Sequence, residues 1–278
     1  MRADTSSGVR LVGRYTLLVF VAAVVLFPIW AVVMQALKSG RDALDHPRSL
    51  LPVDLTFGTI RAAWTEGDLG RLLLNSVVVA VAVTLGVVVT SLLAAYAFAF
   101  LDFPGRNAAF VVFLAAMLVP AEVTVVINRR TADALGWLNT YQGLIVPSLA
   151  STFGVFLLRQ TFLQLPRDLR EAAALDGVGH LRFLWEVATP LSRPTLGALG
   201  LFTFLGTWNA YLWPSQVITD DAHRTIQIGL ESLRTPGDIS QFNLVTGGLV
   251  IAALPIFVML VAFQRQLVRG LTAGAVKG

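Results

Sequence analysis

Six long, mostly apolar runs with few or no charges alternate with polar connections along the chain. Each run is close to or longer than the roughly 20 residues that a helix needs to cross the hydrocarbon core of a bilayer. The pattern therefore predicts an all-α, polytopic membrane protein with six transmembrane helices. The predicted spans are residues 15–37, 72–101, 107–127, 141–160, 195–213 and 243–263.

One polar island, residues 165–194, interrupts the apolar pattern. Residues 167–175 are predicted to form a short helix after Pro166, since proline suits a first helical turn that needs no N–H donor. Gly177 and Gly179 then favour a sharp turn, because glycine tolerates backbone angles that other residues avoid. The apolar side of this first helix is expected to consist of Leu169, Ala172 and Ala173.

A second short helix is predicted over residues 180–188. Pro190 and Pro194 are expected to end it, because proline interrupts the hydrogen-bond pattern of a helix. Two or three turns span only about 15 Å, so neither helix crosses a hydrocarbon layer of ~30 Å. The island must therefore lie at a surface, either as an amphipathic connection on the membrane or against a partner protein. Its second apolar side is expected to consist of Phe183, Leu184 and Val187.

Composition and charge support a membrane protein and suggest its orientation. Hydrophobic residues make up 55% of the chain and charged residues 14%, against about 25% charged in a typical soluble domain. With the N-terminus inside, Lys and Arg are in modest excess on the inner side, and Asp and Glu on the outer side. The tails 1–14 and 265–278 are then cytoplasmic, as is the island, around a transmembrane domain of residues 15–264.

Catalytic signatures are absent from the sequence. A phosphate-binding P-loop needs a Lys after a glycine-rich turn, and neither Lys38 nor Lys277 has that context. The histidines are isolated, and without cysteine no thiolate metal site can form. The sequence therefore predicts a protein that is not an enzyme, binds no cofactor or metal itself and relies on another polypeptide for any ATP hydrolysis. A membrane enzyme or assembly factor stays an alternative.

Polar residues inside the predicted spans are candidates for contact with a transported solute, because such groups are costly in lipid. Glu122 lies in the third span, where it lines a pathway or sits at the level of the lipid headgroups. Asn209 lies in the fifth span beside Trp208 and Tyr211; an amide with aromatic neighbours can bind hydroxyl groups while the rings stack on C–H-rich ligands. The alternative is an interfacial aromatic belt in which Asn209 joins two helices.

A motif in the island points to a family. Its residues are Glu171, Ala172, Ala173, Gly177, Val187 and Pro190. They resemble the EAA loop of binding-protein-dependent ABC importer permeases, which reads EAA, three residues, Gly, nine residues, Ile-x-Leu-Pro. Val187 replaces the Ile and Thr189 replaces the Leu, so the back half matches less well. The chain resembles the second permease subunit of the carbohydrate-uptake, maltose-type branch, and residues 165–194 are termed the EAA-like loop below.

The resemblance implies several roles. The EAA-like loop would be a coupling helix that docks on an ATPase subunit, and the C-terminal GLTAGAVKG resembles a tail that reaches between two ATPase subunits. Implied partners are a second, different permease, two ATPase subunits that bind ATP and Mg, and an external substrate-binding protein at the bacterial cytoplasmic membrane, with no nucleic acid. The implied contacts are Arg170, Glu171, Ala172, Ala173, Asp176 and Gly177 in the loop, and Ala275, Val276 and Lys277 in the tail.

Three segments narrow the resemblance further. MLVPAEV at 117–123, WNAYLWPSQVITD at 208–220 and QRQLVRGL at 264–271 are similar to the subgroup that takes up glycerol 3-phosphate. This implies glycerol 3-phosphate or glycerophosphodiesters as cargo, moved inward by ATP-driven alternating access, with an oligosaccharide such as maltose or trehalose as the alternative. A stand-alone secondary transporter is the alternative of another class, and Glu122 would be its clearest ion-coupling residue.

Overall fold

The computed structural model describes residues 5–233 and 239–273. Within these ranges the chain consists of helices and loops, apart from one isolated bridge between Lys38 and Leu55. The predicted all-α fold class is therefore confirmed. The chain divides into two compact units, Met1–Leu69 with Leu230–Leu254 and Gly70–Gly229 with Pro255–Gly278.

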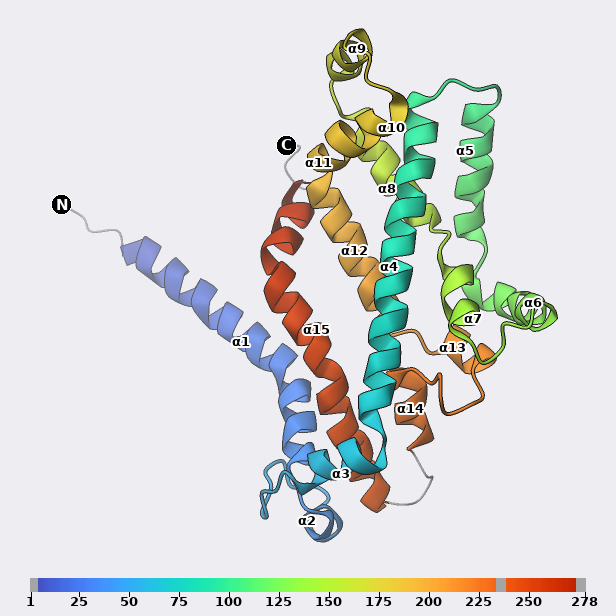
Figure 1. Ribbon diagram of the computed structural model, residues 1–278. Coiled ribbons are helices and arrows are strands. Elements are labelled where there is room, and N and C mark those ends of the chain that lie inside the picture. The colour runs from blue at the N-terminus through green and yellow to red at the C-terminus, as the bar shows by residue number, and fades with distance from the viewer. Residues whose placement is uncertain (1–4, 234–238, 274–278) are drawn as a thin grey trace. The chain divides into compact units, whose positions relative to one another are not determined.

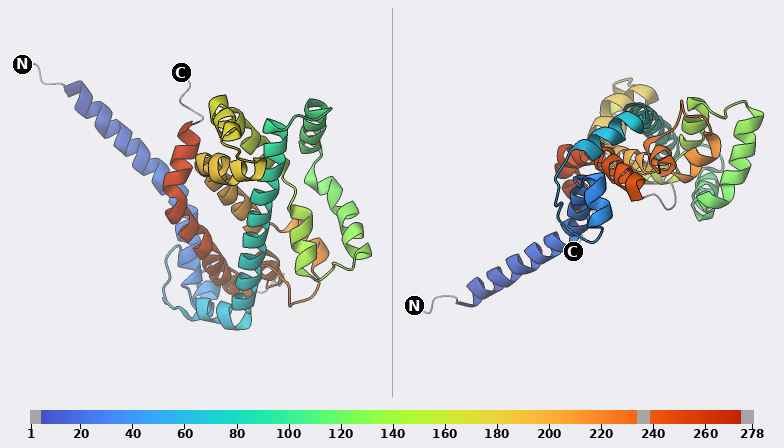
Figure 2. Two further views of the ribbon diagram at one scale, coloured as in Figure 1. Left: turned by 45° about the horizontal axis from the view of Figure 1, so that its top comes forward. Right: turned by 90° about the horizontal axis from the view of Figure 1, so that it is seen from below.

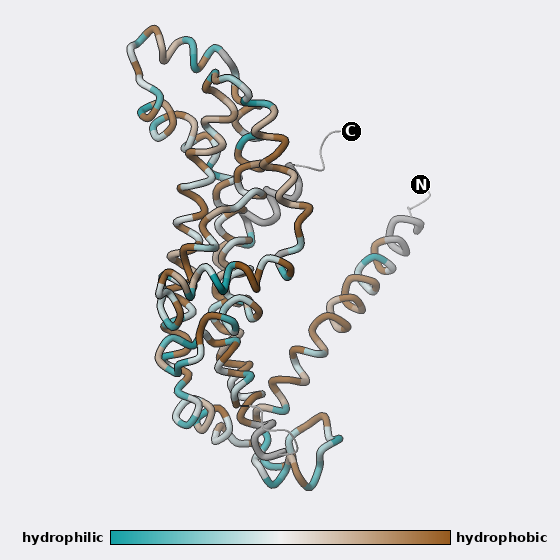
Figure 3. Tube along the Cα trace, turned by 90° about the vertical axis from the view of Figure 1, so that its right-hand side faces the viewer, coloured by the Kyte–Doolittle hydropathy of each residue, from teal (hydrophilic) through white to brown (hydrophobic). Residues whose placement is uncertain are grey.

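The first unit combines the N-terminal helices with the first part of the last helix. Its elements are α1 (Thr5–Ala36), α2 (Gly40–Asp45), α3 (Gly58–Glu66) and the beginning of α15 (Ile239–Ala273). Figure 3 shows α1, beside the N label, as hydrophobic over most of its length. α3 packs closely on α15, where a Cβ on Gly247 would press on Thr59 and Ala63.

Two buried charged residues organise the connection between α1 and α3. Lys38 is fully buried, and its Nζ donates to the carbonyl oxygens of His46 at 3.0 Å and Ser49 at 2.6 Å. Asp42 accepts hydrogen bonds from two backbone N–H groups of the same loop, at 2.8 and 3.2 Å. Burial alone raises the pKa of Asp42, but these N–H groups, His46 and the charge of Lys38 together hold that pKa below its usual value.

The second unit is built around α4 (Leu69–Phe100). Val79, Val83 and Val87 recur every four residues and form a buried stripe on it, as expected for one face of a helix. Leu158 and Leu199 belong to the same core. A Cβ on Gly86 would collide with Leu149, so the small residue lets the chain approach α4 closely. The core partners lie on α8 (Thr152–Leu163) and α12 (Arg193–Trp208).

The two ends of α4 meet different elements, which Figure 1 and Figure 2 show from three directions. Its C-terminal end lies beside α9 (Arg167–Leu175) and α10 (His180–Phe183), and is termed the α9 end. Its N-terminal part contacts the loop before α14 (Ile226–Ser232), and is termed the α14 end. The remaining elements of this unit are α5 (Arg106–Ala115), η1 (Ala116–Leu118), α6 (Ala121–Ala134), α7 (Tyr141–Ile145), η2 (Val146–Ser148), η3 (Leu184–Ala188), α11 (Thr189–Leu191) and α13 (Leu212–Val217).

Three helices of the described residues are long and apolar enough to cross a membrane: Leu11–Ala36, Leu69–Phe100 and Leu244–Gln264. Two bent pairs raise the number to as many as 5, with a 42° bend between Tyr141–Ser148 and Thr152–Leu163. α12 has 16 residues and ends at Trp208, so predicted span 195–213 is not one continuous helix. The number of six spans therefore stays a prediction.

The predicted third span, residues 107–127, is not a straight helix either. The chain turns by 102° between Arg106–Leu118 and Glu122–Ala134. Pro120 stands at the turn in an extended conformation with ψ of 134°, which suits proline because it cannot donate to a continuing helix. The second helical segment then continues to Ala134, beyond the predicted end.

Candidate functional site

The first helix of the EAA-like loop, α9, covers Arg167–Leu175 as predicted. Its end forms a Schellman motif: Val178 N–H donates to the carbonyl of Ala173 at 2.8 Å and Gly177 N–H to that of Ala174 at 3.1 Å. Gly177 has φ of +72°, a left-handed angle that favours glycine. The sequence therefore fixes where α9 stops and where the chain turns toward α10.

The predicted coupling residues divide between two faces of α9. Ala173 is half-buried and packs against the core, and the guanidinium of Arg170 lies 5.6 Å from the centre of the Phe100 ring. Glu171, Ala172, Asp176 and Gly177 are exposed. The packed side differs from the predicted one, because Leu169 and Ala172 are exposed while Ala173 alone of that set faces the core.

The second half of the EAA-like loop continues further than predicted. α10 runs into the π-helical segment η3 and then α11, so Pro190 lies within the helical run and Pro194 lies in the first turn of α12. The prediction that these prolines end the helix is therefore wrong. A π turn is wider than an α turn, which gives room for the proline ring and its missing N–H. Phe183 and Leu184 are buried as predicted, and Val187 packs beside them.

A cleft of about 630 Å³ opens between α9 and the end of α4. Charged side chains from both sides line it, among them Arg106, Arg170 and Glu171. Arg106 Nη1 is paired with Asp102 at 3.0 Å and also donates to the carbonyl of Leu101 at 2.9 Å. The cleft therefore combines positively and negatively charged side chains with the aromatic rings of Phe100 and Phe162. Such a surface is suited to side chains of another protein.

The predicted pathway residues lie at three places. Glu122 is exposed in the first turn of α6, where a carboxylate is favoured by the helix N-terminus. Trp208 is 1% exposed and stacks on Phe204, so its ring belongs to the interior of this chain. Asn209 and Tyr211 are exposed just beyond the end of α12, and Asn209 Nδ2 donates to the carbonyl of Leu205 at 2.8 Å. The structure describes no contact between Glu122 and these residues.

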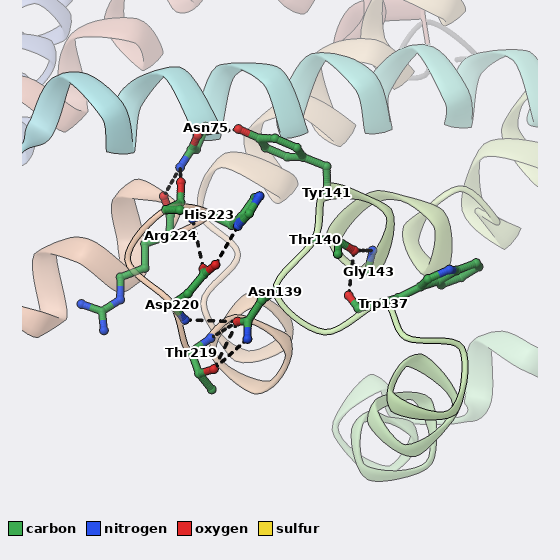
Figure 4. Close-up of polar contacts among 11 residues, drawn as sticks. Asn75, Trp137, Asn139, Thr140, Tyr141, Gly143, Thr219, Asp220, His223 and Arg224 are labelled. Carbon is green, nitrogen blue, oxygen red and sulfur yellow. Dashed lines mark hydrogen bonds and ion pairs between the residues drawn. The ribbon is translucent and has the colours of Figure 1, made fainter.

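Sequence reasoning missed a polar network at the α14 end (Figure 4). Asn75 is 2% exposed, and its Nδ2 donates to the carbonyls of Ala222 at 2.8 Å and Arg224 at 2.9 Å. Its Oδ1 accepts from the hydroxyl of Tyr141 at 2.7 Å. One signal was available, because Asn75 is a polar residue in an apolar run. Its partners could not be identified from the sequence, since Tyr141 is 66 residues away and the two carbonyls are 147 and 149 residues away.

Asn139 is the second hub of this network. Its Oδ1 accepts from the backbone N–H groups of Thr219 at 2.6 Å and Asp220 at 3.1 Å. Asp220 in turn pairs with His223 Nδ1 at 2.9 Å, and the His223 ring lies edge-on to Tyr141 at 5.1 Å. The loop from α13 to α14 is therefore fastened to the start of α7 by directional contacts.

Comparison with known proteins decides the family. The family model described as "Binding-protein-dependent transport system inner membrane component" matches residues 86–272. The chain belongs to this family. It is a permease subunit of a binding-protein-dependent ABC importer, a transport component of the inner membrane.

Individual relatives extend this similarity over nearly the whole permease. The sn-glycerol-3-phosphate transport system permease protein UgpE of Pectobacterium atrosepticum is 34% identical over 275 residues, which are 96% of this chain and 98% of the relative. The protein of the same name from Yersinia pestis is 34% identical over 264 residues, 92% of this chain and 94% of the relative. These similarities agree with the subgroup to which residues 117–123, 208–220 and 264–271 pointed.

The fold is shared with a solved transporter. A chain of a bacterial ABC transporter involved in the import of the acidic polysaccharide alginate matches with a TM-score of 0.82, covering 95% of this permease and 99% of that chain at 21% identity. At this identity the match concerns the fold alone. It confirms that the arrangement of helices is that of an importer permease.

Proposed function

We propose that this permease takes up glycerol 3-phosphate or glycerophosphodiesters. The observation that carries the proposal is the 34% identity over 96% of the chain to a permease named for sn-glycerol-3-phosphate transport. The similarity reaches 98% of that relative, so it includes the proposed pathway segments as well as the EAA-like loop. An oligosaccharide such as maltose or trehalose is the second candidate, because the chain also resembles the second permease subunit of the carbohydrate-uptake, maltose-type branch.

We propose that the permease works with a second, different permease, two ATPase subunits and an external binding protein. Neither of its two lysines, Lys38 and Lys277, follows the glycine-rich turn of a P-loop, so ATP and Mg would be held by the partner ATPase subunits. The α9 end and both chain termini would then face the cytoplasm, where ATP is available.

The exposed face of α9 would dock on an ATPase subunit. Glu171, Ala172, Asp176 and Gly177 are exposed, which leaves them available to a partner. Arg170 and Ala173 face inward and would hold α9 on the permease instead of contacting the ATPase. The tail residues Ala275, Val276 and Lys277 lie outside the described residues, and their contact between two ATPase subunits stays a proposal from the resemblance.

The cargo would pass exposed polar groups near the end of α12. Asn209 and Tyr211 offer an amide, a hydroxyl and an aromatic face, which suit a polyol backbone. Trp208 would support them from the interior, and Glu122 would lie beside the pathway on α6. The first turn of α6 accounts for the charge of Glu122 without ion coupling, so a stand-alone secondary transporter has little support.

The transport cycle would be alternating access. Closure of the ATPase dimer on ATP moves α9, and the two permeases open toward the binding protein, which releases cargo into the pathway. Hydrolysis and product release return the permeases to the inward-open state. The permease contributes the pathway and the helices that move. ATP binding at the ATPase can drive that movement only if it favours one of two conformations.

Reconstitution tests the proposal. The complete complex is placed in proteoliposomes with its binding protein, and ATP-dependent uptake of radiolabelled glycerol 3-phosphate is compared with uptake of maltose and trehalose. Glu171→Lys should reduce uptake more than about tenfold while the protein still inserts, because a reversed charge on the docking face opposes the partner. Glu66→Lys, at an exposed carboxylate of α3, is the control.

Each arm of this experiment has a contradicting result. Uptake of a sugar without uptake of glycerol 3-phosphate would replace the cargo. Normal uptake by Glu171→Lys would remove the proposed role of α9. Uptake by the purified permease alone under an ion gradient, without ATP, would favour the secondary transporter.

A further inference from the structure

The last turns of α4 contact both helices of the EAA-like loop. Tyr96 is 5% exposed, and its hydroxyl lies 2.9 Å from Nδ1 of His180, the first residue of α10. One turn later, Phe100 lies beneath Arg170 of α9 at 5.6 Å. A single helical turn of a membrane helix is therefore joined to the segments on both sides of Gly177.

An aromatic cluster surrounds this junction. Phe100 lies 5.8 Å from Phe183 of α10 and 5.7 Å from Phe162 of α8, measured between ring centres. Tyr96 is 6.5 Å from each of the same two rings. Tyr96, Phe100, Phe162 and Phe183 are termed the aromatic seat. Ring packing of this kind resists separation but allows sliding, because apolar contact has no fixed direction.

The hydrogen bond between Tyr96 and His180 differs from the ring contacts because it is directional. The two side chains belong to different helices, α4 and α10, so the bond joins segments that are far apart in the sequence. A small cavity of about 280 Å³ adjoins this bond, lined by Tyr96 and His180 as well as by Arg170, Ala173 and Val178. Packing between the loop and the end of α4 is therefore incomplete beside this bond, and Tyr96 and Phe100 supply the specific contacts there.

We propose that the Tyr96–His180 hydrogen bond, supported by the aromatic seat, is the positioning contact through which movement of the EAA-like loop reaches α4. This inference rests on the proposed docking of α9 on an ATPase. When α9 and α10 move as a unit, the hydrogen bond fixes their register on α4, so that the displacement is transferred along α4 instead of being lost by sliding. Without it the loop would follow the ATPase while α4 lagged behind.

The test measures two rates in the same proteoliposomes: cargo taken up and ATP hydrolysed. In Tyr96→Phe the ring stays in the aromatic seat and only the hydroxyl is lost. Loss of one hydrogen bond should shift the balance between engaged and slipped states by about fivefold, and the cargo moved per ATP should fall by about that factor. ATP hydrolysis stimulated by the binding protein should stay near the wild-type rate.

Two further variants separate positioning from general damage. His180→Ala should lower the cargo per ATP as Tyr96→Phe does, and His180→Asn, whose amide can reach the place of Nδ1, should restore much of it. The double variant Tyr96→Phe/His180→Ala should be no worse than either single variant, because both remove the same interaction. Tyr15→Phe, at an exposed position of α1, is the matched loss of a hydroxyl.

The outcomes distinguish this inference from the proposed function. Wild-type protein without ATP-dependent uptake would overturn the function, and the positioning contact with it. Wild-type uptake combined with an unchanged cargo-to-ATP ratio in Tyr96→Phe and His180→Ala would overturn only the positioning contact. A parallel fall of uptake and hydrolysis would also overturn it, because this would indicate a structural contact without a role in transmission.

Discussion

The two ends of α4 are held in different ways. At the α14 end, Asn75 makes three hydrogen bonds to groups that lie far away in the sequence, two of them backbone carbonyls. At the α9 end, rings and one side-chain hydrogen bond from Tyr96 hold the EAA-like loop. Directional bonds to the backbone fix a position, whereas apolar ring contacts tolerate displacement. One end of α4 is therefore fixed by directional bonds, and the other end contacts the loop for which we propose movement.

The exposed surfaces support the same contrast. At the α14 end the side chains of Asn75 and Tyr141 bond to each other, while at the α9 end Glu171, Asp176 and the 89% exposed Leu175 are open to solvent. This contrast agrees with our proposal that the α9 end contacts the ATPase, while the α14 end stabilises the permease itself.

The largest effect is expected from two glycines with the same local structure. Gly177 ends α9 and Gly136 ends α6, each in a Schellman motif with φ of +72° and +68°. Proline can adopt neither angle and removes the N–H that each glycine donates, so each substitution breaks its motif. Gly177→Pro should reduce coupled uptake more than about tenfold, while Gly136→Pro should lower stability but leave the cargo-to-ATP ratio of the folded protein unchanged.

Uptake and hydrolysis measured at equal amounts of folded complex decide this prediction. A similar loss of the cargo-to-ATP ratio in both variants would show that any broken helix end disturbs transport. The contrast between the two ends would then be lost.

Features set by neighbouring residues could be predicted from the sequence, whereas features that depend on residues far apart in the chain could not. The bounds of α9 could be predicted, because Pro166 and Gly177 mark its two ends locally. The continuation of the helix through Pro190 could not, since it depends on a π turn that no single residue specifies. The Asn75 network was missed because its partners near residue 222 come close only after the core of the unit has packed.

The next largest effect concerns the anchor itself. Asn75→Leu keeps a similar volume but removes three hydrogen bonds and leaves the carbonyls of Ala222 and Arg224 without their donor. The expected loss is about 3 kcal/mol of folding free energy, because unsatisfied buried groups cost more than a hydrogen bond gains. Thermal unfolding in nanodiscs measures it. A melting temperature equal to that of the wild type would mean that the network does not anchor α4.

A smaller effect is expected when one tyrosine hydroxyl is removed at each end of α4. Tyr141→Phe and Tyr96→Phe each remove one hydroxyl that bonds to another helix or loop. Tyr141→Phe should cost about 1 kcal/mol of stability and leave the cargo-to-ATP ratio unchanged. Tyr96→Phe should change that ratio with a similar or smaller loss of stability. If each of the two variants changed both the stability and the cargo-to-ATP ratio, the two ends of α4 would not have different roles.

The smallest effect is expected from a change of pH, which distinguishes the carboxylate of Asp42 from the amide of Asn75. Asn75 in the second unit and Asp42 in the first both fasten a loop, but only Asp42 titrates. Burial raises the pKa of Asp42, while two N–H donors, His46 and Lys38 lower it by more, so the ionised form is favoured in the folded loop. Its stabilisation is present above the unfolded pKa of about 3.9 and is lost as the pH falls through the lower, folded value. Hydrogen exchange at the amides of Val53 and Asp54 should therefore accelerate below about pH 4, relative to Asp42→Asn measured at the same pH. The amides near Asn75 should show no such acceleration as the pH falls. Equal pH dependence in the wild type and Asp42→Asn would show that the loop is held without the carboxylate.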